Sequence, residues 1–439
     1  MEKAYNPRRL NLMAIALIII VGIVCGLGGY YFGLLSAQVP VRQGTIQTIK
    51  LGLVAHLTGA FVMMGEEAVR GATLAVEEIN ERGGVYVREY NNHLKIELIV
   101  KDDESTADGA IKAVTSLIVE ENVVAIIGPM ASPLTLAVEP IIAQYKVPLF
   151  PLGWGNLTDG WATVDTSTVF HNVPKTTMHA PQILQFLIEV VKPAVAPNRN
   201  LKVACFTIAD VFGEGTAGSV ENVIKSYGYN VGVVFVGTEK VLADQTDFTA
   251  SWTKIKALKP DVVIVTVNNP MAVVQARRDV GLNCLYILWE HLNQAEYWEA
   301  VGEWGDGMLL HSSSILYATP RNYWQLHFRE AYMKRWGKLP GLAARDPYED
   351  VYIVAKAIEE AGTLNKTKII DSLKNLKMPE MCKLMVDRTI KFDELRRVDA
   401  LGWMEQAYMT PQGLRMEIIW PHDLALRQFK VPDYYRPAG

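Results

Sequence analysis

The stretch from Leu51 to Thr158 alternates between apolar strand-like runs and helix-like runs, and a polar or Gly-rich turn follows each strand. Such alternation is typical of a parallel sheet with helices on both faces. In an open parallel sheet, ligands bind beyond the carboxyl ends of the strands. We therefore expect the functional residues in and near the turns at 56–59, 102–105, 128–132 and 152–156.

The elements of this first array can be placed from their patterns. Strands are predicted over Ile49–Ala55, Leu94–Val100, Val123–Ile127 and Val147–Leu152, and helices over Glu66–Asn80, Ala107–Glu121 and Ser132–Tyr145. In the last of these helices, Ser132 suits the N-cap and Pro133 suits the first helical position.

A second array of the same kind begins near residue 173. Its predicted strands are Leu201–Thr207, Val231–Val236, Asp261–Val267 and Leu285–Leu288, and its helices are Thr216–Ser226, Phe248–Leu258 and Met271–Val280. Helical patterns follow at 322–336 and 348–361, and residues 390–419 are β-rich. Two similar arrays in a chain of 439 residues predict two lobes of one α/β architecture.

An uncharged apolar segment precedes both arrays. Residues 12–35 carry no charged side chain, and a helix of that length spans a hydrocarbon layer of about 30 Å. Lys3, Arg8 and Arg9 precede it, so we expect residues 1–11 in the cytoplasm, a single-pass anchor at 12–35 in the cell membrane, a linker at 36–47 and the bulk of the chain on the extracytoplasmic side. A cleaved signal peptide is the alternative.

Charge and motifs argue against several functions. A net charge of −4 and a pI near 6.1 do not suggest a nucleic-acid partner. The sequence has no HExxH, P-loop or GxSxG motif and no metal-type Cys/His spacing, so we expect no cofactor, no metal and no enzyme activity. Cys205 and Cys284 lie in apolar runs and are expected to be buried free thiols. An amidase that uses Glu290 is the enzyme alternative, but the nucleophile and base pair is missing.

An ordered set of short motifs resembles the extracytoplasmic branched-chain amino-acid binding proteins of ABC importers. The motifs include Lys50-Leu-Gly-Leu, Leu57-Thr-Gly, Gly83-Gly84, Ala125-Ile-Ile-Gly-Pro129, Phe212-Gly-Glu-Gly215 and Tyr348-Glu-Asp-Val-Tyr. The resemblance implies the type I periplasmic-binding-protein fold, with two Rossmann-like lobes joined by three crossover segments. These would fall near Phe170–Pro174, His311–Ser314 and Ile390–Asp393. Lobe 1 would then hold 48–172 and 313–390, lobe 2 would hold 173–312 and 391–425, and 426–439 would be a tail.

The resemblance also assigns the two ends of a ligand site. Ser132 matches the family's carboxylate-binding Ser, and a helix N-terminus favours an anion. A simple helix cap is the alternative role for this Ser. Glu290 matches the family's ammonium-binding Glu, and a buried acid at a strand end needs a cation or a donor. A salt bridge to an Arg on the lobe surface is the alternative for Glu290.

Several positions depart from the family pattern. Gly155 stands where the family has a Thr that receives the ammonium, Met64 replaces an aromatic residue, and Phe212 and Asn268 replace Tyr. Trp154 replaces a small residue, and Trp289 either faces the cleft or packs in the core. The full set of expected ligand-binding residues is Met64, Met130, Ala131, Ser132, Gly153, Trp154, Gly155, Phe212, Asn268, Glu290 and Tyr348. Amino acids, small amides and aromatic acids all remain open as ligands.

These expectations together predict an extracellular solute-binding receptor. It would trap a small molecule between its lobes and deliver it to the permease and ATPase subunits of an ABC importer. A ligand-sensing ectodomain that acts with a separate signalling partner is the alternative.

Overall fold

The computed structural model describes residues 47–437 except 154–164, 174–175, 314–317 and 412. The predicted anchor at 12–35 lies outside the described residues, as do Trp154 and Gly155. Every helix within the described part of the chain is too short or too polar to span a bilayer. From Thr48 onward the chain forms one compact unit.

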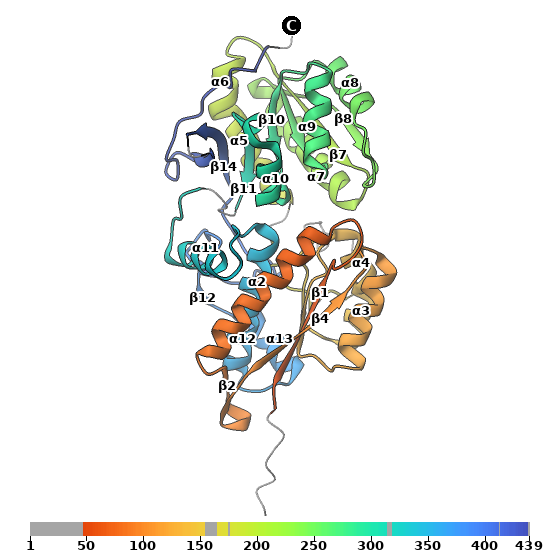
Figure 1. The fold of residues 1–439 in the computed structure, drawn as a ribbon, viewed down its shortest axis with the longest axis vertical. Helices are drawn as coiled ribbons and strands as arrows, with labels where there is room; N and C mark the ends of the chain where they lie inside the picture. The colour runs from red at the N-terminus through yellow and green to blue at the C-terminus, as the bar shows by residue number, and fades with distance from the viewer. Residues whose placement is uncertain (1–46, 154–164, 174–175, 314–317, 412, 438–439) are drawn as a thin grey trace, which may run out of the picture. The chain divides into compact units, whose positions relative to one another are not determined.

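The first array folds around a parallel sheet with the strand order β4-β1-β5-β6. Its strands are β1 (Ile49–Ala55), β4 (Ile96–Asp102), β5 (Ala125–Ile127) and β6 (Leu149–Phe150). The helices that follow β1, β4 and β5 are α2 (Val62–Glu81), α3 (Ala107–Val119) and α4 (Ser132–Tyr145), and a hairpin of β2 (Val85–Val87) and β3 (Asn92–Leu94) precedes β4. Figure 1 shows α2 and α3 on either side of this sheet. The predicted alternation is confirmed.

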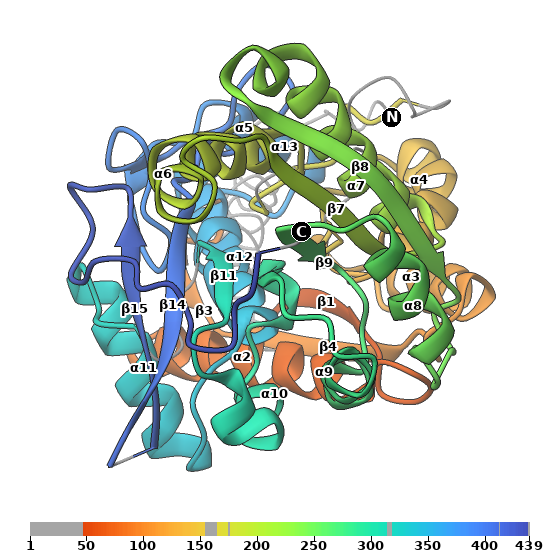
Figure 2. The same ribbon diagram turned by 90° about the horizontal axis from the view of Figure 1, so that it is seen from above.

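The second sheet has the order β15-β14-β11-β10-β9-β7-β8. Its parallel strands are β7 (Leu201–Ile208), β8 (Val233–Val241), β9 (Val262–Val265), β10 (Leu285–Leu288) and β11 (Leu309–Ser312). An antiparallel hairpin, β14 (Trp403–Thr410) and β15 (Gly413–Trp420), extends it from β11. Figure 2 shows this hairpin at the edge opposite β8.

The remaining elements fill the connections. Around the second sheet they are α5 (Thr176–Phe186), α6 (Lys192–Val195), α7 (Val211–Val223), α8 (Thr249–Ala257), α9 (Pro270–Asp279) and α10 (Ala295–Val301). After β11 come α11 (Tyr323–Trp336), α12 (Leu342–Ala361), α13 (Lys366–Lys374) and the short strands β12 (Met378–Pro379) and β13 (Thr389–Ile390).

The buried apolar residues show that the chain passes between two cores three times. One core holds the strands β7 to β11, and the other holds β1, β5 and α12. The chain changes core between Phe170 and Val173, between Leu310 and Phe328, and between Ala400 and Met404. Three crossovers are what the resemblance implies, and they join the two lobes.

The third passage comes later in the chain than the predicted Ile390–Asp393. Ile390 and Phe392 still belong to the core of the first lobe. The ring of Phe392 packs edge-on against Phe170, with the ring centroids 5.2 Å apart, and this contact keeps the segment on the first lobe.

The predicted tail at 426–439 also needs correction. Phe429 and Val431 pack against the core of the second lobe, and Tyr435 is buried in it. The hydroxyl of Tyr435 donates a hydrogen bond of 3.0 Å to Asp261. The described residues after 425 therefore form part of the second lobe.

Close packing of α2 against α12 depends on small side chains. Ala68, Ala72 and Ala75 are buried on one face of α2. A Cβ placed on Gly71 would lie 1.9 Å from the carbonyl oxygen of Ala344 in α12. The backbones of the two helices can approach this closely only where the side chain is a hydrogen atom.

Gly71→Ala should therefore lower the free energy of unfolding by about 1–3 kcal/mol, because the added methyl group forces α2 away from α12. Gly218→Ala is the matched control, since Gly218 lies inside α7 and an added Cβ would meet nothing within 4 Å. It should raise the stability by about 0.5–1 kcal/mol. Urea unfolding of both variants measures the difference, and equal effects would contradict the packing argument.

Candidate functional site

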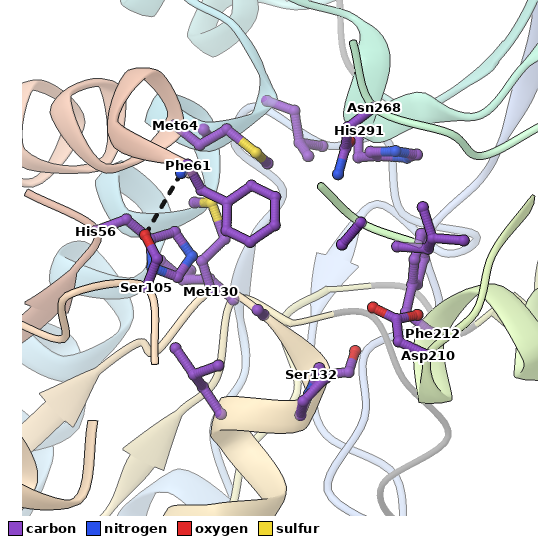
Figure 3. Close-up of a pocket in the computed structure, with 18 of the residues that line it drawn as sticks. His56, Phe61, Met64, Ser105, Met130, Ser132, Asp210, Phe212, Asn268 and His291 are labelled. Carbon is purple, nitrogen blue, oxygen red and sulfur yellow. Dashed lines mark hydrogen bonds between the residues drawn. The ribbon is translucent and has the colours of Figure 1, made fainter. Parts of the chain in front are cut away.

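A cavity of about 280 Å³ lies at the carboxyl ends of strands from both sheets (Figure 3). Its lining comes from the loops after β1, β4, β5 and β6, from those after β7, β8, β9 and β10, and from the start of α12. The residues are His56, Phe61, Met64, Ser105, Met130, Ala131, Ser132, Pro133, Leu134, Leu152, Ile208, Asp210, Phe212, Ala243, Asn268, His291, Leu342, Ala343 and Asp346. The structure thus brings together six of the expected residues, Met64, Met130, Ala131, Ser132, Phe212 and Asn268.

Ser132 begins α4 but does not cap it. Ala131 is the N-cap residue, and no side chain accepts a hydrogen bond from the first turn of the helix. The Ser132 side chain is 2% exposed, and its hydroxyl has no hydrogen-bond partner. The predicted N-cap role is therefore wrong, because Ser132 already has helical geometry. Its unpaired hydroxyl and the free N–H groups of the first turn are left for a ligand.

The loop after β1 places two aromatic rings, His56 and Phe61, at the cavity. His56 Nδ1 lies 2.6 Å from Asp103 Oδ1, and both side chains are buried. A carboxylate only accepts hydrogen bonds, so Asp103 orients the imidazole ring with Nδ1 as the donor. The ring of Phe61 lies against His56 with the centroids 5.4 Å apart. Phe61 and Met64 therefore present apolar surface to the cavity from a rigid support.

The opposite wall combines an aromatic pair with two polar groups. Phe212 and His291 meet edge to face, with ring centroids 5.1 Å apart. Burial lowers the pKa of His291 to about 3, so the ring is neutral at physiological pH. The main chain of Thr266 opposes that shift, but neither ring nitrogen makes a hydrogen bond of normal geometry. Asn268 and His291 thus offer uncharged donors and acceptors to a ligand.

Asp210 also lines this wall. It caps α7, and its Oδ1 accepts a hydrogen bond of 2.8 Å from the backbone N–H of Gly213. Burial raises the pKa of its carboxyl group above the usual range. In Figure 3 the carboxylate of Asp210 and the hydroxyl of Ser132 face each other across the cavity.

Glu290 does not line the cavity. It is fully buried just after β10, and its Oε1 lies 3.0 Å from Nη1 of the equally buried Arg345 in α12. The hydroxyl of Ser313 donates a second hydrogen bond of 2.5 Å to the same oxygen. Burial raises the pKa of the Glu290 carboxyl group, and the charge of Arg345 opposes this rise. The cation that this acid needs is thus supplied by the chain itself.

Two other expected positions, and Trp289 beside Glu290, also lie off the lining. Gly153 stands behind the cavity wall, where an added Cβ would lie 2.8 Å from the carbonyl oxygen of Met130. Tyr348 is a buried residue of α12, and its hydroxyl donates a hydrogen bond of 2.8 Å to Glu78 of α2. Trp289 is also fully buried, with its ring stacked on His179. Its core-packing alternative is thus confirmed.

The lining residues that the sequence analysis missed had readable signals. His56 is the first residue of the turn at 56–59, and His291 directly follows Glu290. The glycines at 213 and 215 favour a helix that begins only at Thr216, so the sequence does not predict that Asp210 caps it. An added Cβ on Gly213 would lie 2.1 Å from the carbonyl oxygen of Ile208, so this Gly allows the close return of the chain that starts α7 at Val211.

The described residues contain no group of three or more His, Cys, Asp or Glu side chains that could hold a metal ion. Cys205 and Cys284 are buried free thiols, as predicted. The cavity is therefore a pocket with mixed apolar and polar walls whose polar groups offer hydrogen bonds.

Comparison with known proteins identifies the family. The sequence profile described as "Periplasmic binding protein" matches residues 48–394. The chain belongs to the periplasmic binding protein family. Among curated proteins, this periplasmic binding protein is similar to "Leu/Ile/Val-binding protein homolog 7" of Brucella abortus, with 24% identity over 416 residues that cover 88% of this chain and 94% of the relative. The predicted resemblance to branched-chain amino-acid binding proteins is confirmed.

Solved structures agree with this assignment. The branched-chain amino acid transporter substrate binding protein LivJ from Streptococcus pneumoniae, in complex with isoleucine, aligns with a TM-score of 0.71 and 25% identity, covering 85% of this chain and all of that chain. A solute binding protein of an ABC transporter from Rhodopseudomonas palustris, in complex with 3,4-dihydroxy benzoic acid, aligns with a TM-score of 0.71 and 21% identity, covering 88% and 99%. The type I fold of this periplasmic binding protein follows from these matches.

Ser132→Ala should not lower the free energy of unfolding of the ligand-free protein and should raise it by up to about 1–3 kcal/mol, because it removes a buried hydroxyl that has no hydrogen-bond partner. Thr106→Ala is the matched control, since the Thr106 hydroxyl caps α3 by accepting a hydrogen bond of 3.0 Å from the N–H of Gly109. Its loss should cost about 1 kcal/mol. Chemical denaturation without ligand measures the free energy of unfolding of both variants. A loss of about 1 kcal/mol or more in the Ser132 variant would restore the capping role.

Proposed function

We propose that this chain is the solute-binding receptor of an ABC importer, which captures a small amino acid, amide or aromatic acid in the cavity and delivers it intact to a membrane permease. The observation that carries the proposal is the unpaired, buried hydroxyl of Ser132 at the uncapped start of α4, inside a cavity that both lobes line. A buried polar group without a partner is costly unless a ligand satisfies it.

The acid end of the ligand binds at α4. None of the described residues that line the cavity is a lysine or an arginine. A carboxylate must therefore be held by neutral donors, which are the Ser132 hydroxyl and the N–H groups of the first turn. The positive end of the helix dipole adds to this attraction by about 0.3–1 kcal/mol or more in a buried setting.

The apolar part of the ligand lies against the remaining walls. Phe61, Met64 and Met130 on one side and Phe212 on the other offer a surface that suits a branched aliphatic chain or a flat ring. A second hollow of about 540 Å³ shares Phe61, Met64, Ala243 and Asn268 with the cavity. Side chains larger than those of the aliphatic amino acids therefore have room. Amino acids, amides and aromatic acids are the ligand classes that we propose.

Ligand binding favours the closed arrangement of the two lobes. A molecule that contacts Ser132 on one lobe and Phe212 or Asn268 on the other gains its full contact energy only when both walls are in place. Its higher affinity for that arrangement shifts the population of the receptor toward it. The permease and ATPase subunits of the importer are the partners that respond to this closed form.

We further propose that the receptor works on the extracytoplasmic side of the cell membrane. The uncharged segment 12–35 serves as its tether, and the basic residues Lys3, Arg8 and Arg9 keep the short N-terminus inside.

Calorimetric titration of the full-length chain in detergent tests the binding proposal. The panel contains aliphatic and aromatic amino acids, small amides and benzoic acids. We expect at least one carboxylate to bind, and Ser132→Ala to weaken it roughly tenfold to hundredfold, which corresponds to about 1–3 kcal/mol. Thr106→Ala is the control that should keep full affinity, since Thr106 does not line the cavity. Equal affinity of the wild type and the Ser132 variant would contradict the proposal that the ligand's carboxylate binds at the start of α4.

A further inference from the structure

The acid that the family resemblance assigns to a ligand amine already has a cation beside its Oε1, while its buried Oε2 makes no hydrogen bond to the described residues. Glu290 and Arg345 are 0% and 1% exposed, and their charged atoms lie 3.0 Å apart. The Ser313 hydroxyl bridges them, since it donates to Glu290 Oε1 and accepts a hydrogen bond of 3.1 Å from Arg345 Nη1. A ligand ammonium at Glu290 would have to displace a buried guanidinium from this arrangement, which would break a buried ion pair and leave Arg345 with Asp346 alone.

Asp346 is the next acid in reach, because it lines the cavity. Its Oδ1 lies 2.7 Å from Nη2 of Arg345 and 2.8 Å from Nζ of Lys383. Two buried cations therefore share this carboxylate. An additional ammonium group would meet their repulsion at close range, so Asp346 is a poor site for an amine.

Asp210 differs from both of these acids. It lines the cavity, it is only partly buried, and it forms no ion pair with any described residue. One carboxylate oxygen caps α7 through Gly213. The carboxylate faces Ser132 across the cavity (Figure 3), so an acid end and a donor end of one small ligand can reach the two groups at once.

We infer that Asp210, and not Glu290, accepts the hydrogen bonds of the ligand's ammonium or amide N–H group. This inference rests on the proposed receptor function and specifies the ligand class. The ligand carries a carboxylate for α4 and a nitrogen donor close to it, as an α-amino acid does. A partly desolvated carboxylate without a cation on the protein favours a ligand that brings the positive charge.

The test compares each amino acid with the same acid lacking its amine, for example leucine with 4-methylpentanoate and phenylalanine with 3-phenylpropanoate. Calorimetry on the full-length wild-type chain should show at least tenfold tighter binding of the amino acid. Asp210→Asn should abolish that preference by weakening only the amino acid. Because Asn caps helices as well as Asp does, this variant keeps the start of α7 while it removes the charge.

Glu290→Gln is the matched comparison and should keep the preference within about threefold. Since Glu290→Gln leaves the buried Arg345 with Asp346 as its remaining ion-pair partner, the double variant Glu290→Leu with Arg345→Met provides a second version in which both members of the Glu290–Arg345 pair are removed together. Both versions should still bind the amino acid at least tenfold more tightly than the same acid without its amine. Circular dichroism confirms that each variant is folded before titration.

Three results would overturn the inference. Loss of the preference in the Glu290 variants, with its retention in Asp210→Asn, would return the amine to Glu290. Equal or tighter binding of the amine-free acids by the wild type would show that the ligand has no such donor, while the receptor function would stand. Failure of every acid and amino acid to bind would remove the receptor function itself, and the role of Asp210 with it.

Discussion

The direction of the parallel strands is the constraint on which the site depends. Parallel neighbours must be joined by crossovers, so every loop that leaves a carboxyl end emerges on the same side of its sheet. In this protein the loops after four strands of each sheet reach one cavity. The chain passes between the two cores three times, and it thereby holds the two loop sets against each other. No single loop builds the site, because each contributes only one to five side chains.

Buried charge is the second organising feature. Arg345 and Lys383, both nearly inaccessible to solvent, bind the carboxylates of Glu290, Asp346 and Glu349. Such groups lose their hydration on folding and recover that cost only in close mutual contact. The network joins α12 of the first lobe to the end of β10 in the second lobe. The network therefore holds α12 and the end of β10 in place beside the cavity. The hydrogen-bonding groups of the cavity walls remain available to a ligand.

Sequence patterns predicted most of the fold and part of the site. Strands and helices were placed well because apolar runs and Gly-rich turns are local signals, and Met130, Ala131 and Ser132 follow one such strand directly. The pairing of Glu290 with Arg345 joins residues far apart in the chain, and no local pattern encodes it. The cap by Asp210 is not predicted, because the glycine-rich start of α7 resembles a loop and the predicted helix begins only at Thr216. The Glu290–Arg345 pair is thus a contact through space that local patterns do not encode, whereas the cap is a local contact between Asp210 and Gly213.

The two hollows of the cleft share Phe61 and Met64 from the start of α2, and Ala243 and Asn268 from the second lobe. The groups that hold the head of a ligand, Ser132 and its neighbours, stand on other elements. Substitution of Phe61 or Met64 would change how long a molecule fits, while the Ser132 hydroxyl and the first turn of α4 would still hold its polar end. Related receptors could thus diversify the tails they accept by varying one short segment, while the recognition of the head group stays constant.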